Sequence, residues 1–276
     1  PRYMGMTPTA AAVVEIAAVG DGVRGWSPLD RAVLGRHLPT GNPLPGLAAF
    51  IPMDARFRQE VALKLPVEIP ADEATMLPAA ALAARCLREA RVPRGGTLLV
   101  VGLGLAGQIA LLLARHQGAR GIFAADASPT LLKKAEYNGA SRVIGAGEAS
   151  VREVLVRETG GHGVDAVLLL GGEPAWMQEG VQSLAVGGTV VFGIPLTTSV
   201  QLGMVSTHIQ GRELRIQGVR AFGPRDVKTA LKAMSQGTLN GDSLISRRIP
   251  WDKLDGERLE PGYWDHGTHL VVEGPE

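Results

Sequence analysis

A glycine-rich turn between an apolar strand and an amphipathic helix constrains the fold of this chain more than any other feature. Residues 97–126 read "TLLVVGLGLAGQIALLLARHQGARGIFAAD". The run before the first glycine is apolar and β-branched, as in a buried strand of a parallel sheet. The apolar residues that follow share one face of a helix, namely Leu105, Ile109, Leu112 and Leu113. This order of elements predicts a βαβ unit.

The same alternation of strand and helix continues along the middle of the chain. Strands are expected at "GIFAAD", "SRVI", "VDAVLLLGG", "TVVFGI" and "ELRIQGV". Two of the helices between these strands have N-terminal capping signals, namely Ser128 with Pro129 and Ser150 with Glu153. "PAWMQEGVQSLAVGG" is expected to be a further helix that ends at its paired glycines. Together these segments predict the α/β class, with a doubly wound parallel sheet of the Rossmann type over residues 78–221.

The two ends of the chain lack this alternation. Prolines interrupt residues 1–77 throughout, which leaves room only for short strands and turns in a smaller β-rich domain. Residues 11–23, "AAVVEIAAVGDGV", are the one convincing strand pair there. Residues 222–276 should form a helix at 224–237, followed by strands at "SLISRRIP" and "HLVVE".

Composition excludes several functional classes. The formal net charge is +1 and the two signs are interleaved, so nucleic acid is not an expected partner. No apolar run reaches the about 20 residues that a membrane crossing needs, and no signal-peptide pattern opens the chain, so we expect a cytoplasmic protein. Cys86 is the single cysteine, which excludes an intrachain disulfide and a zinc site with two thiolates. We expect Cys86 to be a small buried residue on a helix.

The motif "GLGLAG" fits the pattern GxGxxG and stands between the predicted strand and helix, where such a motif binds a dinucleotide. Gly102 permits the tight turn, Gly104 lets the backbone approach a pyrophosphate, and Gly107 lets the helix pack closely on the sheet. The amide groups at the start of the helix then face the anion. This predicts a phosphate cradle at the first βα turn.

Asp126 ends the second predicted strand, where a carboxylate can accept hydrogen bonds from both hydroxyls of an adenosine ribose. The same carboxylate would repel a 2′-phosphate, and the following residues, "ASPTLL", contain no cation to neutralise one. NAD(H) is therefore the predicted cofactor, in preference to NADP(H). Two alternatives remain open: a plain turn that binds nothing, and a domain that binds another adenine nucleotide, such as a methyl donor.

From about residue 20 to residue 249 the chain resembles the medium-chain dehydrogenase/reductase superfamily, on its alcohol, polyol and threonine dehydrogenase branch. "VGDGV" followed by "DRAV", "PRGGTLLVVGLGLAGQIALLLARHQGA", "TGGHGVDAVLLLGG" and "AVGGTVVFGI" are similar to successive family segments in the expected order. The resemblance implies a GroES-like catalytic domain beside the Rossmann domain. It gives domains at 1–77 (GroES-like, shortened), 78–221 (dinucleotide-binding) and 222–276 (the return to the GroES-like domain).

The resemblance also implies which residues line the cofactor. Together with the glycine motif and Asp126, the expected cofactor-binding residues are Gly102, Gly104, Leu105, Ala106, Gly107, Asp126, Ala127, Leu170, Gly171, Gly172, Gly193 and Ile194. The residues after the fourth and fifth strands would hold the nicotinamide ribose and carboxamide. The segment from Glu213 to Val219 is similar to the edge strand through which family members form homodimers, so a homodimer is expected.

The chain departs from the family at the zinc ligands. Residues 4–9, "MGMTPT", stand where the family has its Gly-His-Glu ligand motif, and the next ligand would fall near Leu77 or Pro78. The family's cysteine-rich structural zinc lobe corresponds to a region, residues 35–56, that contains no cysteine. The family's opening strands also have no counterpart here. We therefore expect neither a catalytic nor a structural zinc ion.

Without zinc, another group must handle the hydroxyl proton during hydride transfer. The histidines form no HxH or HxxxH pair, and Tyr3 and His208 are only weak candidates for a catalytic role. Two hypotheses follow: a zinc-independent NAD(H)-dependent oxidoreductase acting on a small alcohol, polyol or ketone, or a catalytically inactive binding, sensing or assembly module. A chain trimmed at Pro1 favours the enzyme, and a natural start near Pro1 favours the module. The sequence identifies neither the substrate nor the direction of the reaction.

Overall fold

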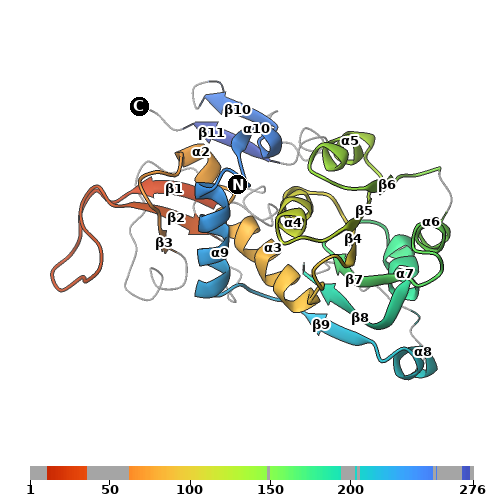
Figure 1. Cartoon of the computed structure of the whole chain (residues 1–276). Coiled ribbons are helices and arrows are strands. Elements are labelled where there is room, and N and C mark those ends of the chain that lie inside the picture. The colour runs from red at the N-terminus through yellow and green to blue at the C-terminus, as the bar shows by residue number, and fades with distance from the viewer. Residues whose placement is uncertain are drawn as a thin grey trace. The chain divides into compact units, whose positions relative to one another are not determined.

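In the computed structural model, a six-stranded parallel sheet with the strand order β6-β5-β4-β7-β8-β9 organises the second part of the chain (Figure 1). Its strands are β4 (Thr97–Val101), β5 (Gly121–Ala125), β6 (Arg142–Ile144), β7 (Val164–Leu169), β8 (Leu184–Phe192) and β9 (Arg215–Gly218). The structure describes residues 11–35, 62–147, 150–193, 203, 206–250, 253 and 269–273. The strand order reverses between β4 and β7, as in a doubly wound Rossmann sheet.

Helix α3 (Leu77–Ala90) leads into β4, and the other helices connect successive strands of this sheet. They are α4 (Leu105–His116), α5 (Pro129–Tyr137), α6 (Val151–Glu158), α7 (Pro174–Gln182) and the short α8 (Ser206–Gly211). Within this layer α4 packs against α5 and β4, and α6 packs against α7. The strands supply most of one buried core cluster, to which α6 adds Val151, Val154 and Leu155. The predicted α/β fold class is confirmed.

The capping residues that the sequence predicts lie at these helix ends. The Ser128 hydroxyl accepts a hydrogen bond from the Leu131 amide, and Pro129 occupies the first turn of α5. The Ser150 hydroxyl accepts a hydrogen bond from the Glu153 amide at the start of α6. Gly139, just after α5, has a positive φ of 102°, which a residue with a side chain rarely adopts.

The prediction of one helix through the paired glycines Gly187 and Gly188 is wrong. Helix α7 ends at Gln182, and β8 begins at Leu184, which pairs with Val164. The two glycines lie inside β8, where the register shifts before Thr189 resumes the pairing with β7. Glycine marks an irregular position in a strand as readily as a helix end, because it tolerates a positive φ in both.

Residues 1–79 form a separate compact unit, and residues 80–276 form the second. In the first unit β1 (Ala11–Glu15), β2 (Arg31–Gly35) and β3 (Ala62–Lys64) make an antiparallel sheet in that order, beside the short helix α2 (Ala71–Ala74). The expected strand pair within residues 11–23 is therefore wrong: Val13 of β1 pairs with Val33 of β2. Residues 16–30 form the connection instead, with a positive φ at Gly22 and at Gly25.

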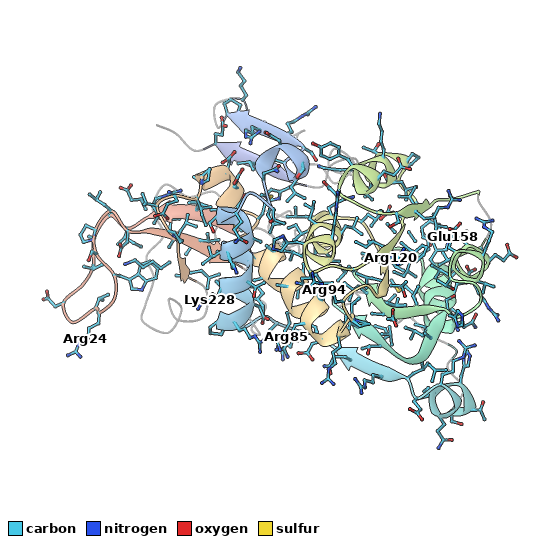
Figure 2. All side chains as sticks on the ribbon, viewed as in Figure 1. Arg24, Arg85, Arg94, Arg120, Glu158 and Lys228 are labelled. Carbon is cyan, nitrogen blue, oxygen red and sulfur yellow. The ribbon has the colours of Figure 1, made fainter. Side chains whose placement is uncertain are left out.

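The end of the chain contains α9 (Pro224–Ser235), α10 (Gly241–Leu244) and two parallel strands, β10 (Arg247–Pro250) and β11 (Leu270–Glu273). These elements belong to the second compact unit, and the expectation that 222–276 completes the GroES-like domain stays a prediction. Charged side chains are dispersed over separate elements of this unit, for example Arg85 on α3, Glu158 on α6 and Lys228 on α9 (Figure 2). Among the described residues, no helix has the length and apolar character that a bilayer crossing requires.

Candidate functional site

Hydrogen bonds between neighbouring strands bring the predicted site residues to one edge of the sheet. At the carboxyl ends, the Gly102 amide donates to Ala125 (3.0 Å), the Leu170 amide to Val101 (2.8 Å) and the Gly193 amide to Leu169 (3.0 Å). The Asp126 amide likewise donates to the Ile144 carbonyl at 3.3 Å. Ligands of open α/β sheets bind at this edge, where the strand order reverses.

The three motif glycines meet different surroundings. A Cβ on Gly102 would lie 2.5 Å from Gly171, across the strand-order reversal, and Gly102 also has a positive φ of 89°. A Cβ on Gly107 would lie 2.2 Å from the Gly102 carbonyl oxygen. A Cβ on Gly104 would meet nothing within 4 Å, and Gly104 is exposed. Two glycines are therefore required by the packing of the protein itself, whereas the third leaves open space above the turn.

This open space fits a pyrophosphate. Gly104 is the N-cap of α4 and no side chain caps the helix there. The Gln108 amide makes the first hydrogen bond of α4, to the Gly104 carbonyl. The amides before it, at Leu105, Ala106 and Gly107, have no acceptor within the helix and are available to an anion. No acidic residue stands in the first turn of α4 to repel one. The turn thus has the shape of a phosphate cradle, and a side chain at position 104 would occupy the place of the ligand.

The Asp126 carboxylate joins the glycine turn to the start of α5. It accepts a hydrogen bond from the Leu103 amide at 2.7 Å and another from the Ser128 amide at 2.9 Å. Asp126 is partly exposed and its neighbour Ala127 is exposed. A carboxylate has about four lone-pair sites, so two remain for the hydroxyls of a ribose. Asp126 can thus hold the turn and a ligand together.

A second group of predicted residues lies across the reversal. Gly171 and Gly172 have positive φ values of 153° and 92°, and Leu170 is buried. Gly193 is buried against two side chains: a Cβ there would lie 2.4 Å from Leu170 Cδ2 and 2.6 Å from the sulfur of Cys86. Burial raises the pKa of the Cys86 thiol to about 12. Cys86 is thus a buried residue on a helix, as the sequence predicted, and the structure places its uncharged thiol beside this edge.

The other three predicted site residues are Tyr3, Ile194 and His208. Tyr3 and Ile194 lie outside the described residues. His208 lies in α8, at the end of the sheet where β9 begins (Figure 1). Arg212, just after α8, donates to the carbonyls of Gln182 and Leu184 beside the start of β8. The role of His208 in catalysis therefore stays a prediction without support from its position.

Within the described ranges, no three His, Cys, Asp or Glu side chains are grouped so that they could hold a metal ion. The expected ligand region at 4–9 and most of residues 35–56 lie outside those ranges. Leu77 and Pro78, where a further family ligand would fall, are buried apolar residues at the start of α3. The described residues therefore offer no donor set that fits zinc.

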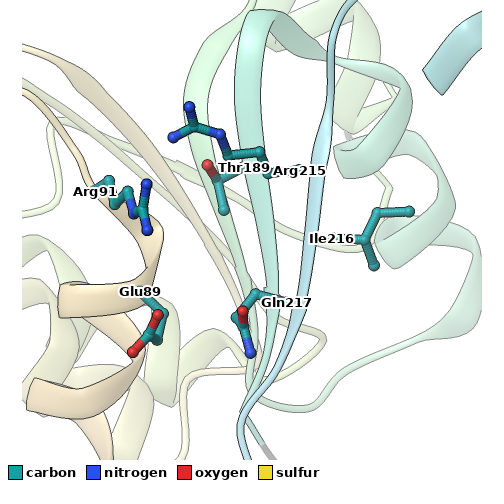
Figure 3. Close-up of a pocket in the computed structure, with 6 residues that line it drawn as sticks. All are labelled: Glu89, Arg91, Thr189, Arg215, Ile216 and Gln217. Atoms are coloured by element: carbon teal, nitrogen blue, oxygen red, sulfur yellow. The ribbon is translucent and has the colours of Figure 1, made fainter. Parts of the chain in front are cut away.

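A pocket elsewhere on the sheet is not part of the candidate site (Figure 3). Its lining residues are Glu89, Arg91, Thr189, Arg215, Ile216 and Gln217. Thr189 stands level with Ala166 and Leu98 in the register, near the beginning of β4. Gly102, by contrast, follows the last residue of β4. The pocket therefore lies away from the carboxyl edge.

Sequence reasoning missed two buried amides behind the glycine turn, Gln108 and Asn138. Both are fully buried, and the Asn138 side chain donates to the Gln108 side chain at 2.9 Å. Gln108 itself donates to the carbonyls of Leu103 and Leu131, at 3.2 and 2.9 Å. The available signal was a glutamine inside the otherwise apolar run of α4.

Part of the chain that holds this site is similar to known dehydrogenases. Residues 104–236 match the family model described as zinc-binding dehydrogenase. The chain is 26% identical to (R,R)-butanediol dehydrogenase of Bacillus subtilis over 79% of its length and 60% of the relative's. It is 28% identical to the NADP-dependent isopropanol dehydrogenase of Thermoanaerobacter brockii, over 65% of this chain and 57% of that enzyme. The chain thus spans about 60% of the length of these curated relatives.

Solved structures share the fold. That of 2R,3R-butanediol dehydrogenase from Bacillus subtilis superposes with a TM-score of 0.78 at 22% identity, over 96% of this chain and 79% of the other. An Escherichia coli CFT073 protein described as a short chain alcohol dehydrogenase, in complex with NADH, gives a TM-score of 0.75 at 17% identity, over 98% and 90% of the two chains. The matching family model over residues 104–236, the dehydrogenase relatives and the shared fold together support a zinc-type medium-chain dehydrogenase/reductase-like superfamily member.

Proposed function

We propose that this protein is an oxidoreductase that transfers hydride between a nicotinamide dinucleotide and a small alcohol, polyol or ketone. The observation that carries the proposal is the open turn at Gly104, set between the uncapped start of α4 and the Asp126 carboxylate. The substrate class rests on the relatives, which are named as butanediol, isopropanol and sorbitol dehydrogenases.

The protein's own residues would bind and orient the cofactor along the carboxyl edge. The amides at the start of α4 would hold the pyrophosphate, and Asp126 the adenosine ribose. The backbone at Gly171 and Gly193 would hold the nicotinamide end, where the neighbouring Leu170 and Cys86 side chains are buried and exclude water. The bound dinucleotide would supply a nicotinamide ring that accepts or delivers hydride.

We further propose NAD(H) as the preferred cofactor and a reaction without zinc. The Asp126 carboxylate would repel a 2′-phosphate, and α5 carries no basic residue in its first turn. One relative is NADP-dependent by name and one related structure contains NADH, so the preference rests on the residues of this chain. Absence of zinc rests on residues 4–9 and on the apolar Leu77 and Pro78, none of which supplies a ligand.

Titration of the metal-stripped protein with NAD⁺, NADH and NADPH tests the proposal, followed by a spectrophotometric screen of alcohols, polyols and ketones. We expect NADH to bind more tightly than NADPH, and turnover with at least one substrate. Binding without turnover would favour the alternative, a catalytically inactive binding or sensing module. No binding of any dinucleotide would overturn the cofactor assignment and leave "GLGLAG" as a turn that binds nothing.

Asp126→Ala should weaken NADH binding by about 1 kcal/mol or more, because hydrogen bonds to the ribose are lost. The ratio of NADPH to NADH affinity distinguishes two causes. If Asp126 recognises the ribose, the variant loses its preference for NADH, because the repulsion of the 2′-phosphate is removed as well. If Asp126 only supports the turn, both affinities fall by the same factor and the predicted role in cofactor selection is wrong.

A further inference from the structure

The Gln108 side chain lies directly behind the glycine turn, on the side away from solvent. Its Nε2 donates to the Leu103 carbonyl at 3.2 Å and to the Leu131 carbonyl of α5 at 2.9 Å. Its Oε1 accepts from Asn138 Nδ2 at 2.9 Å. Gln108 and Asn138 are both 0% exposed. One buried amide thus connects the turn, the first turn of α5 and the end of α5.

The Leu103 residue is therefore held at both of its backbone polar groups. Its amide donates to Asp126 at 2.7 Å, and its carbonyl accepts from Gln108. Leu103 stands between Gly102 and Gly104, so its backbone orientation determines where the open face of the turn points. Asp126 approaches from the accessible side and Gln108 from the buried side.

Asn138 fixes the orientation of the Gln108 amide. The two carbonyls of Leu103 and Leu131 can only accept, so the Gln108 nitrogen must face them and its oxygen must face Asn138. Asn138 then donates to that oxygen, while its own Oδ1 is buried and has no hydrogen-bond partner among the described residues. A buried polar atom without a partner is unfavourable, so an apolar side chain would satisfy this site better if packing alone mattered.

We propose that Gln108, oriented by Asn138, is a positioning residue that holds the glycine turn in the geometry that binds the dinucleotide pyrophosphate. The inference rests on the proposed function, because the ligand of the turn is the proposed cofactor. Gln108 does not reach the ligand itself and carries no preference between NAD(H) and NADP(H). It acts equally on every dinucleotide, through the orientation of Leu103.

Gln108→Met tests this role, because methionine has a similar length but cannot donate to the two carbonyls. We expect the affinities for NADH and NADPH to fall by the same factor, about tenfold, since a buried carbonyl loses its donor next to the cradle. The affinity ratio should stay at the wild-type value, unlike that of Asp126→Ala. Hydrogen exchange of the amides at residues 102–107, measured without ligand, should become faster than in the wild type.

Thr97→Val is the matched control. The Thr97 hydroxyl donates to Asp165 Oδ2 at 2.8 Å and accepts from the Asp165 amide at 3.0 Å, at the opposite end of β4. This substitution also removes a partly buried hydrogen-bonded group, so it should lower the melting temperature without changing dinucleotide affinity. If Gln108→Met fails to fold, Asn138→Leu keeps the Gln108 donors and should give a smaller loss of affinity in the same direction.

The possible failures are distinguishable. A wild-type protein that binds no dinucleotide overturns the proposed function, and with it this inference. A wild-type protein that binds NADH, together with a folded Gln108→Met variant of unchanged affinity, overturns the inference alone. A loss of affinity as large in Thr97→Val as in Gln108→Met shows general destabilisation and also overturns it.

Discussion

At the scale of single residues, the motif glycines separate what the fold requires from what a ligand requires. Gly104 has an ordinary φ of −58° and open space at its Cα, whereas Gly107 abuts the Gly102 carbonyl. Gly104→Ala should therefore cost at most about 1 kcal/mol of unfolding free energy, as a changed N-cap. Its added methyl group should nevertheless reduce NADH affinity by roughly tenfold or more, because it stands where the pyrophosphate binds.

Gly107→Ala provides the contrasting variant. Its Cβ would be 2.2 Å from a backbone oxygen, so about 1–3 kcal/mol of unfolding free energy should be lost to overpacking. Chemical denaturation and NADH titration of both variants check the pair. Unchanged NADH affinity in a stable Gly104→Ala protein would mean that the pyrophosphate of NADH does not bind at this turn.

Single residues also limit what the sequence could predict. The spacing of Gly102, Gly104 and Gly107 and the carboxylate at Asp126 predicted the cradle, because those signals are local. Gln108 and Asn138 are separated by 30 positions and meet only after α4 and α5 have packed together. No local pattern relates them, so their pairing could not be predicted.

At the scale of helices and strands, an ion pair connects α3 to α9. Arg88 donates from Nε and Nη2 to the two carboxylate oxygens of Asp226, at 3.0 and 3.3 Å, and Asp226 is 2% exposed. Burial acts to raise the pKa of Asp226, but hydrogen bonds from Arg88 and from the Gly223 amide outweigh it and lower that pKa. The folded state thus favours the ionised carboxylate.

Asp226→Asn should lower the unfolding free energy at pH 7 by about 2 kcal/mol, because it removes charge-assisted hydrogen bonds. The folded pKa is below the unfolded one, so this stabilisation is complete above the unfolded value and is lost as pH falls through the folded value. Urea denaturation at pH 7 and at pH 3 should show a difference between variant and wild type that shrinks in acid. Glu158→Gln, in the exposed pair with Arg157, is the control and should change stability by less than about 0.5 kcal/mol. A difference for Asp226→Asn that is the same at both pH values would contradict the assigned role of the charge.

The elements also show where pattern reasoning succeeded and where it failed. Strands β4 and β7 and helices α4 and α5 have apolar patterns with clear end signals, and they were predicted correctly. In the segment that forms β8, the glycine pair Gly187 and Gly188 matches the sequence signal of a helix C-terminus. The pairing of Leu184 with Val164 decides that this segment is a strand, and such a pairing exists only once the sheet has formed.

At the scale of the whole molecule, the sheet has one edge at β9, which pairs only with β8 among the described strands. Ile216 on this strand is 46% exposed. An unpaired edge strand that exposes an apolar side chain can pair with another chain, so we propose a homodimer through residues 213–219. Light scattering should give the mass of a dimer for the wild type and of a monomer for Ile216→Asp, since edge charges oppose strand pairing. A monomeric wild type would contradict the proposal.

The hydrogen bonds of Asp126 to the Leu103 and Ser128 amides have an evolutionary consequence. A lineage that changed its preference to NADP(H) would need to lose the Asp126 carboxylate. That loss would also remove the hydrogen bonds that hold the glycine turn, which every dinucleotide needs. The first substitution on that route would therefore be harmful unless another group already held Leu103. Gln108 also holds Leu103, from the buried side. Related chains that keep this glutamine could therefore lose the carboxylate and still bind a dinucleotide, whereas chains without it could not. Cofactor preference in such sequences should then depend on the order in which the two positions change.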